Sequence, residues 1–336
     1  MAIVVIGVGG YLSFKDSNTL TEIVPWNCTP SVGGNLEHSC RPWFGVWVNG
    51  YIDNSTVREH VLRHEELIQK QFDIIHFYHP PGKYLLSDDE RYFYNRDNTY
   101  LYINWKPTLV WSEAAGDNAA INESIDQMAR EIKALGAKKL FLTVFHEPEN
   151  DVSHGAEQCK ELKGTSGTPA DYIAMWRTVR ERFDTLGVRN VVWTMNYMGF
   201  SQWDCMINAL WPGNEYVDWV TYDPFSSRGQ SYQDTVGRFY NVLESSSDAK
   251  HNYISKPWGL AEFGVNNYSD TFKNSFYQQA LGSIERNEYP RLKLYMVFDA
   301  IGTDDDFRIF VNQDKRIDWS SAPEYLQFVS SKKFKD

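Results

Sequence analysis

The sequence lacks the short motifs that define several large classes of enzyme. Its four cysteines form no C-x-x-C pair, so neither a zinc-binding nor a thioredoxin-like pattern is present. It contains no G-x-G-x-x-G or P-loop, and no H-E-x-x-H or G-x-S-x-G. The acidic run at residues 304–307 lacks the spacing of a calcium loop, so a solvated loop is expected there. We therefore expect no cofactor and no bound metal.

Positive charge and long apolar runs are also scarce. Lys and Arg number 33 against 44 Asp and Glu, which gives a net charge of −11. Nucleic acids and anionic membranes are bound by basic surfaces, so neither is an expected partner. No stretch approaches the roughly 18 apolar residues of a membrane span. The opening MAIVVIGVGGYLSF is open to two interpretations, part of a signal peptide or a strand, because it lacks a basic region and a clear cleavage site.

The few cysteines and the many aromatic residues each allow two interpretations. Cys28 and Cys40 are close enough to staple one loop, in which case Cys159 and Cys205 would link two later loops. An even number fits an oxidising compartment, although buried free thiols are an alternative. Aromatic residues make up 15% of the chain and serve either a large core or platforms that stack on sugar rings. We expect a secreted, monomeric protein.

Short β-rich runs alternate with helical patterns along the chain. Strands are predicted at residues 43–48, 74–78, 100–105, 139–145, 190–195, 217–222, 258–263 and 292–298. Helices are predicted at residues 55–72, 119–135, 169–187 and 270–286, the third opened by Thr168 and a proline. Eight strands that alternate with helices predict an α/β protein, a single-domain (β/α)8 TIM barrel. Residues 41–336 would form the catalytic barrel, and residues 1–40 a lead segment packed on it.

In such a barrel the chemistry lies where the strands end. The fourth predicted strand ends in FHEPEN and the seventh in GLAEFGV, which places Glu147 and Glu262 at the rim. Glutamate is rare in strands, and an isolated buried carboxylate is costly, so Glu262 is either paired or functional. Glu147 could instead be a surface acid after a strand. Strands four and seven face each other across the barrel mouth, so the two acids can share a cleft, as glycosidic cleavage requires.

Several segments together resemble glycoside hydrolase family 26. The pair His146-Glu147 on strand four, PGNEYVDWVTYD along strand six, NWKP on strand three and GLAEFGV on strand seven are each similar to that family's motifs. The resemblance extends from Trp43 to about Trp319. It implies a retaining hydrolase of β-linked polysaccharide, most often β-mannan, and sometimes mixed-linkage β-glucan or β-1,3-xylan.

The resemblance also implies roles for particular residues. Glu147 would be the acid/base and Glu262 the nucleophile. Further residues are expected to bind the sugar or line the cleft: His79, Trp105, His146, Asn150, Trp193, Asn196, Tyr222, Asp223 and Phe298. Independently of the resemblance, the nucleophile must stay ionised, and a donor such as Tyr222 or His146 would help.

The sequence departs from the family around the expected cleft. The run HEPENDVSHG lacks the aromatic residues that usually follow the acid/base, and its Glu149 is either a sugar contact or a solvated charge. Phe225 aligns with the tyrosine that hydrogen-bonds the nucleophile in the family. VFDA replaces a tryptophan platform on strand eight, where Phe298 or Asp299 would stand in. We expect an endo-β-1,4-mannanase, with another β-glycan or a microbial exopolysaccharide as the alternative substrate and a non-catalytic carbohydrate-binding barrel as a second alternative.

Overall fold

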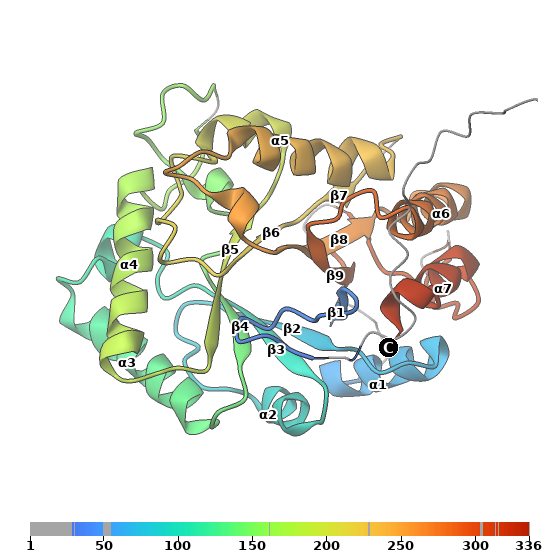
Figure 1. Ribbon diagram of the computed structural model, residues 1–336, viewed down its shortest axis with the longest axis horizontal. Coiled ribbons are helices and arrows are strands. Elements are labelled where there is room, and N and C mark those ends of the chain that lie inside the picture. Colours follow the sequence, from blue (N-terminus) through green and yellow to red (C-terminus); the bar gives the residue numbers. More distant parts are fainter. Residues whose placement is uncertain are drawn as a thin grey trace, which may run out of the picture.

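A computed structural model describes residues 29, 31–49, 55–160, 162–227, 229–302, 305–312, 314 and 316–335. Eight parallel strands form a closed barrel with helices around it, which confirms the predicted (β/α)8 fold (Figure 1). The barrel strands are β1 (Trp43–Val48), β2 (Ile74–His79), β3 (Tyr100–Trp105), β4 (Leu140–Val144), β5 (Val191–Tyr197), β6 (Trp219–Tyr222), β8 (Trp258–Val265) and β9 (Leu292–Asp299).

Two pairings close the barrel and one short strand lies outside it. β1 pairs with β9, and β6 pairs with β8, and these two pairings complete the ring of eight barrel strands. The two-residue strand β7 (Phe225–Ser226) pairs with the end of β8 at the rim. All eight predicted strands are therefore present, with ends that differ by a few residues.

Five of the seven α-helices in the described part of the chain begin with a side chain that caps the first turn, and α5 and α7 do not. They are α1 (Val57–Ile68), α2 (Asp88–Asn95), α3 (Ala119–Ala134), α4 (Pro169–Thr185), α5 (Arg238–Ser246), α6 (Asp270–Glu285) and α7 (Pro323–Val329). At the start of α4 the Thr168 hydroxyl accepts a hydrogen bond from the Asp171 amide, and the Asp171 carboxylate accepts one from the Thr168 amide. This capping box satisfies amides that the first turn leaves without partners. The predicted start of that helix is confirmed.

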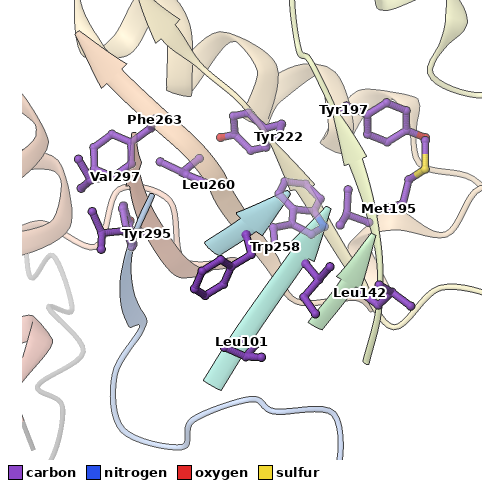
Figure 2. Packing of buried hydrophobic residues seen from close by; sticks show 14 of the residues in the cluster. Leu101, Leu142, Met195, Tyr197, Tyr222, Trp258, Leu260, Phe263, Tyr295 and Val297 are labelled. Atoms are coloured by element: carbon purple, nitrogen blue, oxygen red, sulfur yellow. The ribbon is translucent and has the colours of Figure 1, made fainter. Parts of the chain in front are cut away.

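Strand alternation sorts side chains into two layers. Successive side chains of a strand point to opposite faces, so one set fills the barrel and the other packs against the helices. The inner set includes Ile74, Tyr102, Phe141 and Trp219. Figure 2 shows part of the larger outer cluster, in which side chains from β3, β4, β5, β8 and β9 pack together. This sorting decides which polar residues reach the barrel mouth.

The segment before β1 contacts the end of the barrel opposite the site. The indole of Trp219 donates to the carbonyl of Asn35 at 2.7 Å, and Leu36 belongs to the inner barrel cluster. Most of the predicted lead segment, residues 1–28 and 30, lies outside the described residues, so its packing stays a prediction. In the part of the chain that the structure covers, no helix has the length and apolarity to cross a membrane.

Candidate active site

A β-bulge turns Glu262 into the barrel. Leu260 is aligned with Tyr295 of β9 and Phe263 with Val297, so three steps on β8 match two on β9. Leu260 and Phe263 both lie in the outer cluster, whereas Ala261 belongs to the inner one. Strict alternation would direct residue 262 outward, and an extra residue in a strand re-aims the side chains that follow it. Glu262 therefore faces the inside of the barrel, where it is 4% exposed.

The acid at the end of β4 is positioned by a strained turn. Phe145 and Glu147 adopt left-handed backbone conformations, with φ of 57° and 51°. Such conformations are unfavourable for residues other than glycine and persist where the surroundings enforce them. The amide of Glu147 donates to the backbone and side-chain oxygens of Asn196 on β5, each at 3.3 Å. This anchor fixes the start of the η2 turn (Pro148–Asp151).

Three carboxylates meet at the barrel mouth. Glu147, Asp223 and Glu262 each place an oxygen within 4.8 Å of the others. Asp223 and Glu262 are buried, and Glu147 keeps part of its surface open. Asp223 follows β6 and accepts a hydrogen bond from Asn196 Nδ2 at 3.0 Å. The two predicted catalytic acids and the strand-six aspartate therefore lie together.

Burial raises the pKa of all three carboxyl groups. Burial, followed by the Glu262 carboxylate, raises the pKa of Glu147 to about 8. Burial raises the pKa of Glu262 to about 7, although the Tyr78 hydrogen bond and the Lys106 charge lower it. Burial and both glutamates raise the pKa of Asp223 well above its usual range. The hydrogen bond from Tyr78 favours the ionised form of Glu262, as its predicted nucleophilic role requires.

Polar residues from β2 and β3 surround Glu262. The Tyr78 hydroxyl donates a hydrogen bond to Glu262 Oε1. Asn104 Nδ2 donates to the same oxygen at 3.2 Å, and His76 Nε2 lies 4.0 Å from it. Sequence reasoning assigned none of these three to the site, although polar residues at alternate positions of two apolar strands were a visible signal.

Four predicted site residues lie on the outer faces of their strands, which corrects the expectation that they line the cleft. Trp105 and Trp193 both pack against Phe183 of α4, and Tyr222 donates to the carbonyl of Val236 at 2.9 Å. The His79 ring bonds the buried Glu90 of α2. In each case the inward positions are those one residue away, because side chains alternate along a strand.

Glu149 is a buried carboxyl group and not a solvated charge. It is 2% exposed, and its carboxyl accepts hydrogen bonds from the amides of Met198, at 2.9 and 3.1 Å, and Gly199, at 3.4 Å. Burial raises its pKa to about 8. Glu149 therefore ties the loop that carries Glu147 to the loop after β5.

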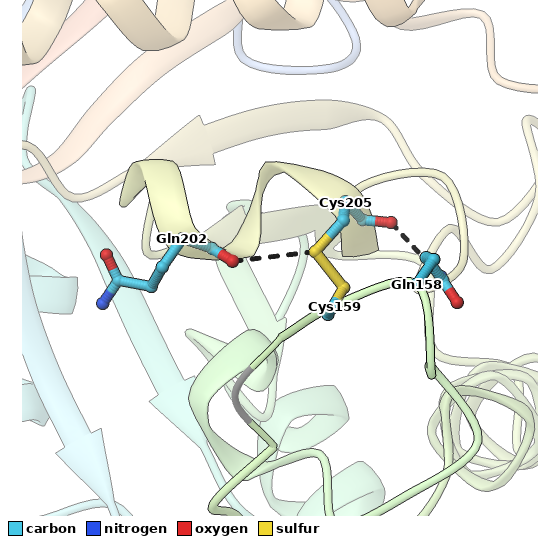
Figure 3. Close-up of a disulfide and its surroundings, with 4 residues drawn as sticks. All are labelled: Gln158, Cys159, Gln202 and Cys205. Carbon is cyan, nitrogen blue, oxygen red and sulfur yellow. Dashed lines mark hydrogen bonds between the residues drawn. A yellow bond between two sulfur atoms is a disulfide. The ribbon is translucent and has the colours of Figure 1, made fainter.

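A disulfide joins the same two loops. Cys159 bonds Cys205 of the η3 turn (Ser201–Met206), with their Cα atoms 5.7 Å apart (Figure 3). The Gln158 side chain donates to the carbonyl of Cys205 at 3.4 Å. The link between two later loops is confirmed for this pair. Cys28 lies outside the described residues.

The remaining predicted residues lie near the carboxylates or at the rim. The His146 ring centroid lies 5.4 Å from that of Tyr78, and burial keeps the His146 pKa well below its usual range, so the ring is neutral. His146 Nδ1 and Asn150 Oδ1 are buried and have no hydrogen-bond partner among the described residues. Phe298 packs with Phe225 and Phe307 at the end of β9. Buried polar atoms without partners are uncommon, and a ligand would satisfy them.

An eight-stranded barrel with two facing carboxylates at its mouth is the arrangement that many glycoside hydrolases use to cleave glycosidic bonds. The chain belongs to glycosyl hydrolase family 26: the model of that family matches residues 96–278, more than half of the chain and a span that includes both glutamates. No curated protein matches it.

Solved structures of the family share the fold. The family 26 domain of an endo-β-mannanase/endo-β-glucanase from Prevotella bryantii is 15% identical, with a TM-score of 0.55 over 87% of this chain and 90% of that one. A β-mannanase from Bacteroides ovatus is 16% identical, with a TM-score of 0.56 over 87% and 89%. The catalytic domain of an endo-β-1,4-mannanase from Bacillus sp. JAMB-750 is 13% identical, with a TM-score of 0.55 over 88% and 86%. At these identities the likeness concerns the fold alone.

Proposed function

We propose that this protein is a retaining β-glycoside hydrolase, with Glu262 as nucleophile and Glu147 as acid/base. The observation that carries the proposal is the approach of their carboxylate oxygens to within 4.8 Å. Retaining enzymes hold the two carboxyl groups about 5–5.5 Å apart, whereas inverting enzymes need about 6.5–9.5 Å to admit water. The contacts support the same assignment, because the Tyr78 hydrogen bond favours an ionised Glu262, and the Glu262 charge favours a protonated Glu147.

The two steps follow from these positions. Glu262 attacks the anomeric carbon while the bond from that carbon to the leaving oxygen breaks, and Glu147 gives its proton to that oxygen. Glu147, now ionised, takes a proton from a water molecule, whose oxygen attacks the same carbon and releases Glu262. Each step inverts the anomeric carbon, so the product keeps the β configuration. Lys106, which forms an ion pair with Asp151, adds positive charge that lowers the pKa of both acids.

We propose β-1,4-mannan, cleaved internally, as the substrate. Membership of family 26 and neighbours named as mannanases support this choice. One observation favours a different β-glycan, such as mixed-linkage glucan, β-1,3-xylan or an exopolysaccharide. Trp105 and Trp193 are buried at 0% and 4% exposure against the helices, so neither is available as a sugar platform.

Product analysis on a panel of purified glycans tests the substrate and the mechanism together. Proton NMR early in hydrolysis, before mutarotation, should show the β anomer of the new reducing end. First release of the α anomer would overturn the retaining assignment. Internal cleavage should give a ladder of oligosaccharides from mannan, and a ladder from another glycan alone would replace mannan as the substrate.

Variants test the residue roles. Glu262→Ala and Glu147→Ala should each lower turnover about 10³-fold or more while the fold persists. Added azide should give an α-glycosyl azide with Glu262→Ala and a β-glycosyl azide with Glu147→Ala on an activated substrate. Glu285→Ala, at the exposed end of α6, is the matched control and should retain full activity. Near-normal turnover in either site variant would refute its role.

We also propose that the protein is secreted. The Cys159–Cys205 disulfide supports an oxidising compartment, where such bonds persist. Antibody detection in the culture medium of the native host, against a cytosolic marker, tests this proposal, and retention inside the cell would contradict it.

A further inference from the structure

The nucleophile is held by only one of its two carboxylate oxygens. Tyr78 and Asn104 both donate to Glu262 Oε1, the second at 3.2 Å. Among the residues that the structure covers, none donates a hydrogen bond to Oε2. A carboxylate held in this way keeps one oxygen fixed and presents the other to the cleft.

The donor comes from an unexpected strand. The resemblance to family 26 places a tyrosine at position 225, but this chain has phenylalanine there. The Phe225 ring packs at 4.7 Å from Phe307 and 5.1 Å from Phe298, so it serves the apolar rim. The nearby Tyr222 hydroxyl donates to Val236 on the outer face of β6. The phenol that reaches Glu262 belongs to β2, almost two hundred residues earlier in the chain.

We propose that Tyr78 has taken over the nucleophile-binding role from the strand-six position, and that Glu262 Oε2 is the atom that attacks the sugar. This inference rests on the proposed retaining mechanism. As Oε2 bonds to the anomeric carbon, Oε1 becomes the carbonyl oxygen of an ester and loses its negative charge. In the second step the charge returns to Oε1, and the Tyr78 hydroxyl stabilises the departing carboxylate.

The surroundings of Tyr78 fit this role. Its ring packs against those of Trp47, with ring centroids 4.8 Å apart, and His76, at 4.4 Å, and these contacts restrict the direction of the hydroxyl. Lys83 Nζ donates to the Tyr78 carbonyl at 3.3 Å and pairs with Glu90. Burial, followed by the charge of Glu262, raises the Tyr78 pKa well above its usual range, so the phenol keeps its proton and acts only as a donor.

The test begins with the carboxylate itself, independently of any substrate. Carbon-13 NMR of protein labelled at the glutamate carboxyl carbons, assigned with Glu262→Gln, reports the pKa of Glu262. Tyr78→Phe keeps the packed ring and removes the donor, so it should raise that pKa. Asn104→Ala should raise it less, and this second variant covers the case in which Tyr78→Phe fails to fold. An unchanged pKa in the folded variants would overturn the proposal.

Kinetics then test the role in the reaction. Tyr78→Phe should lower kcat/KM about 10²-fold and move the acidic limb of its pH profile to higher pH. Tyr197→Phe is the matched control, because this buried tyrosine of β5 donates to the carbonyl of Ile207 on the outer face. If the wild type is active and Tyr78→Phe keeps both rate and profile, only this inference fails. If the wild type cleaves no β-glycan, the proposed function fails, and a changed Glu262 pKa would still locate the donor.

Discussion

Removal of the negative charge of Glu262 should lower the pKa of Glu147. The perturbation is Glu262→Gln, which keeps the shape of the side chain. The two carboxylates have oxygens within 4.8 Å of each other, and two unit charges at that upper limit repel by about 3.5 kcal/mol at an effective dielectric constant of about 20. One pKa unit corresponds to about 1.4 kcal/mol, so the pKa of Glu147 should fall from about 8 by about 2.5.

The direction of this change explains how one residue can act first as acid and then as base. Before the reaction the ionised Glu262 repels negative charge on Glu147 and holds the proton there. Once Glu262 forms an ester with the sugar, its charge is gone, and Glu147 becomes a stronger acid. It can then remain ionised and accept a proton from water in the second step. Glu262→Gln imitates the charge state of the ester.

The assay is carbon-13 NMR titration of the Glu147 carboxyl carbon, assigned by loss of its signal in Glu147→Gln. Glu285→Gln, at the exposed end of α6, controls for the loss of any negative charge. It should leave the Glu147 titration in place. If Glu147 titrates within about half a pH unit of wild type in Glu262→Gln, then burial alone raises its pKa, and the argument for charge coupling is wrong.

Three further changes test the supports of the site. Burial raises the pKa of Glu149 from 4.5 to about 8. Between these two pH values the folded chain binds this proton and the unfolded chain does not. The free energy of unfolding therefore falls as the pH rises, by up to about 1.4 kcal/mol per pH unit. Glu149→Gln should flatten that slope in thermal melts from pH 5 to 8, and an unchanged slope would contradict this. The Cys159–Cys205 disulfide closes a loop with a sequence separation of 46. Replacement of both cysteines by serine should lower the free energy of unfolding in urea by about 2–4 kcal/mol. An unchanged midpoint of the urea unfolding curve would argue against the disulfide. Trp193→Phe should lower the free energy of unfolding by about 1–2 kcal/mol and leave KM unchanged, because Trp193 packs against Phe183 of α4. A raised KM with unchanged stability would indicate instead that Trp193 contacts the substrate.

The sequence predicted the barrel well because strand runs and helix caps are local signals. Thr168 and the proline after it located the start of α4 to the residue, and all eight strand runs were found. The short helix α5 was not predicted. It follows a π-helical turn at Gln233–Gly237, and its place against the barrel is set by tertiary packing, which local patterns do not report.

Only part of the candidate site could be predicted, because the end of a strand is easier to locate in a sequence than the side chains that face into the barrel. Glu147, Glu262, Asp223 and Asn196 lie together as expected. Trp105, however, lies outside the barrel, and its neighbour Asn104 reaches the nucleophile. The error came from preferring an aromatic residue, with its sugar-stacking chemistry, over the polar residue beside it. A polar side chain in an apolar strand was the better signal, since its burial costs free energy unless it has a partner or a function.

The bulge in β8 marks the limit of reasoning from sequence. Leu260 faces outward, so alternation alone would send Glu262 outward as well, into the apolar layer beneath the helices. The extra residue exists only through the pairing of β8 with β9, and no local pattern encodes it. Ala261 and Glu262 then both face inward, and the small Ala261 fits within the inner cluster below the carboxylate. The desolvation cost of a lone glutamate in GLAEFGV therefore indicated that Glu262 has a function. Only the pairing of β8 with β9 determined that its side chain faces into the barrel.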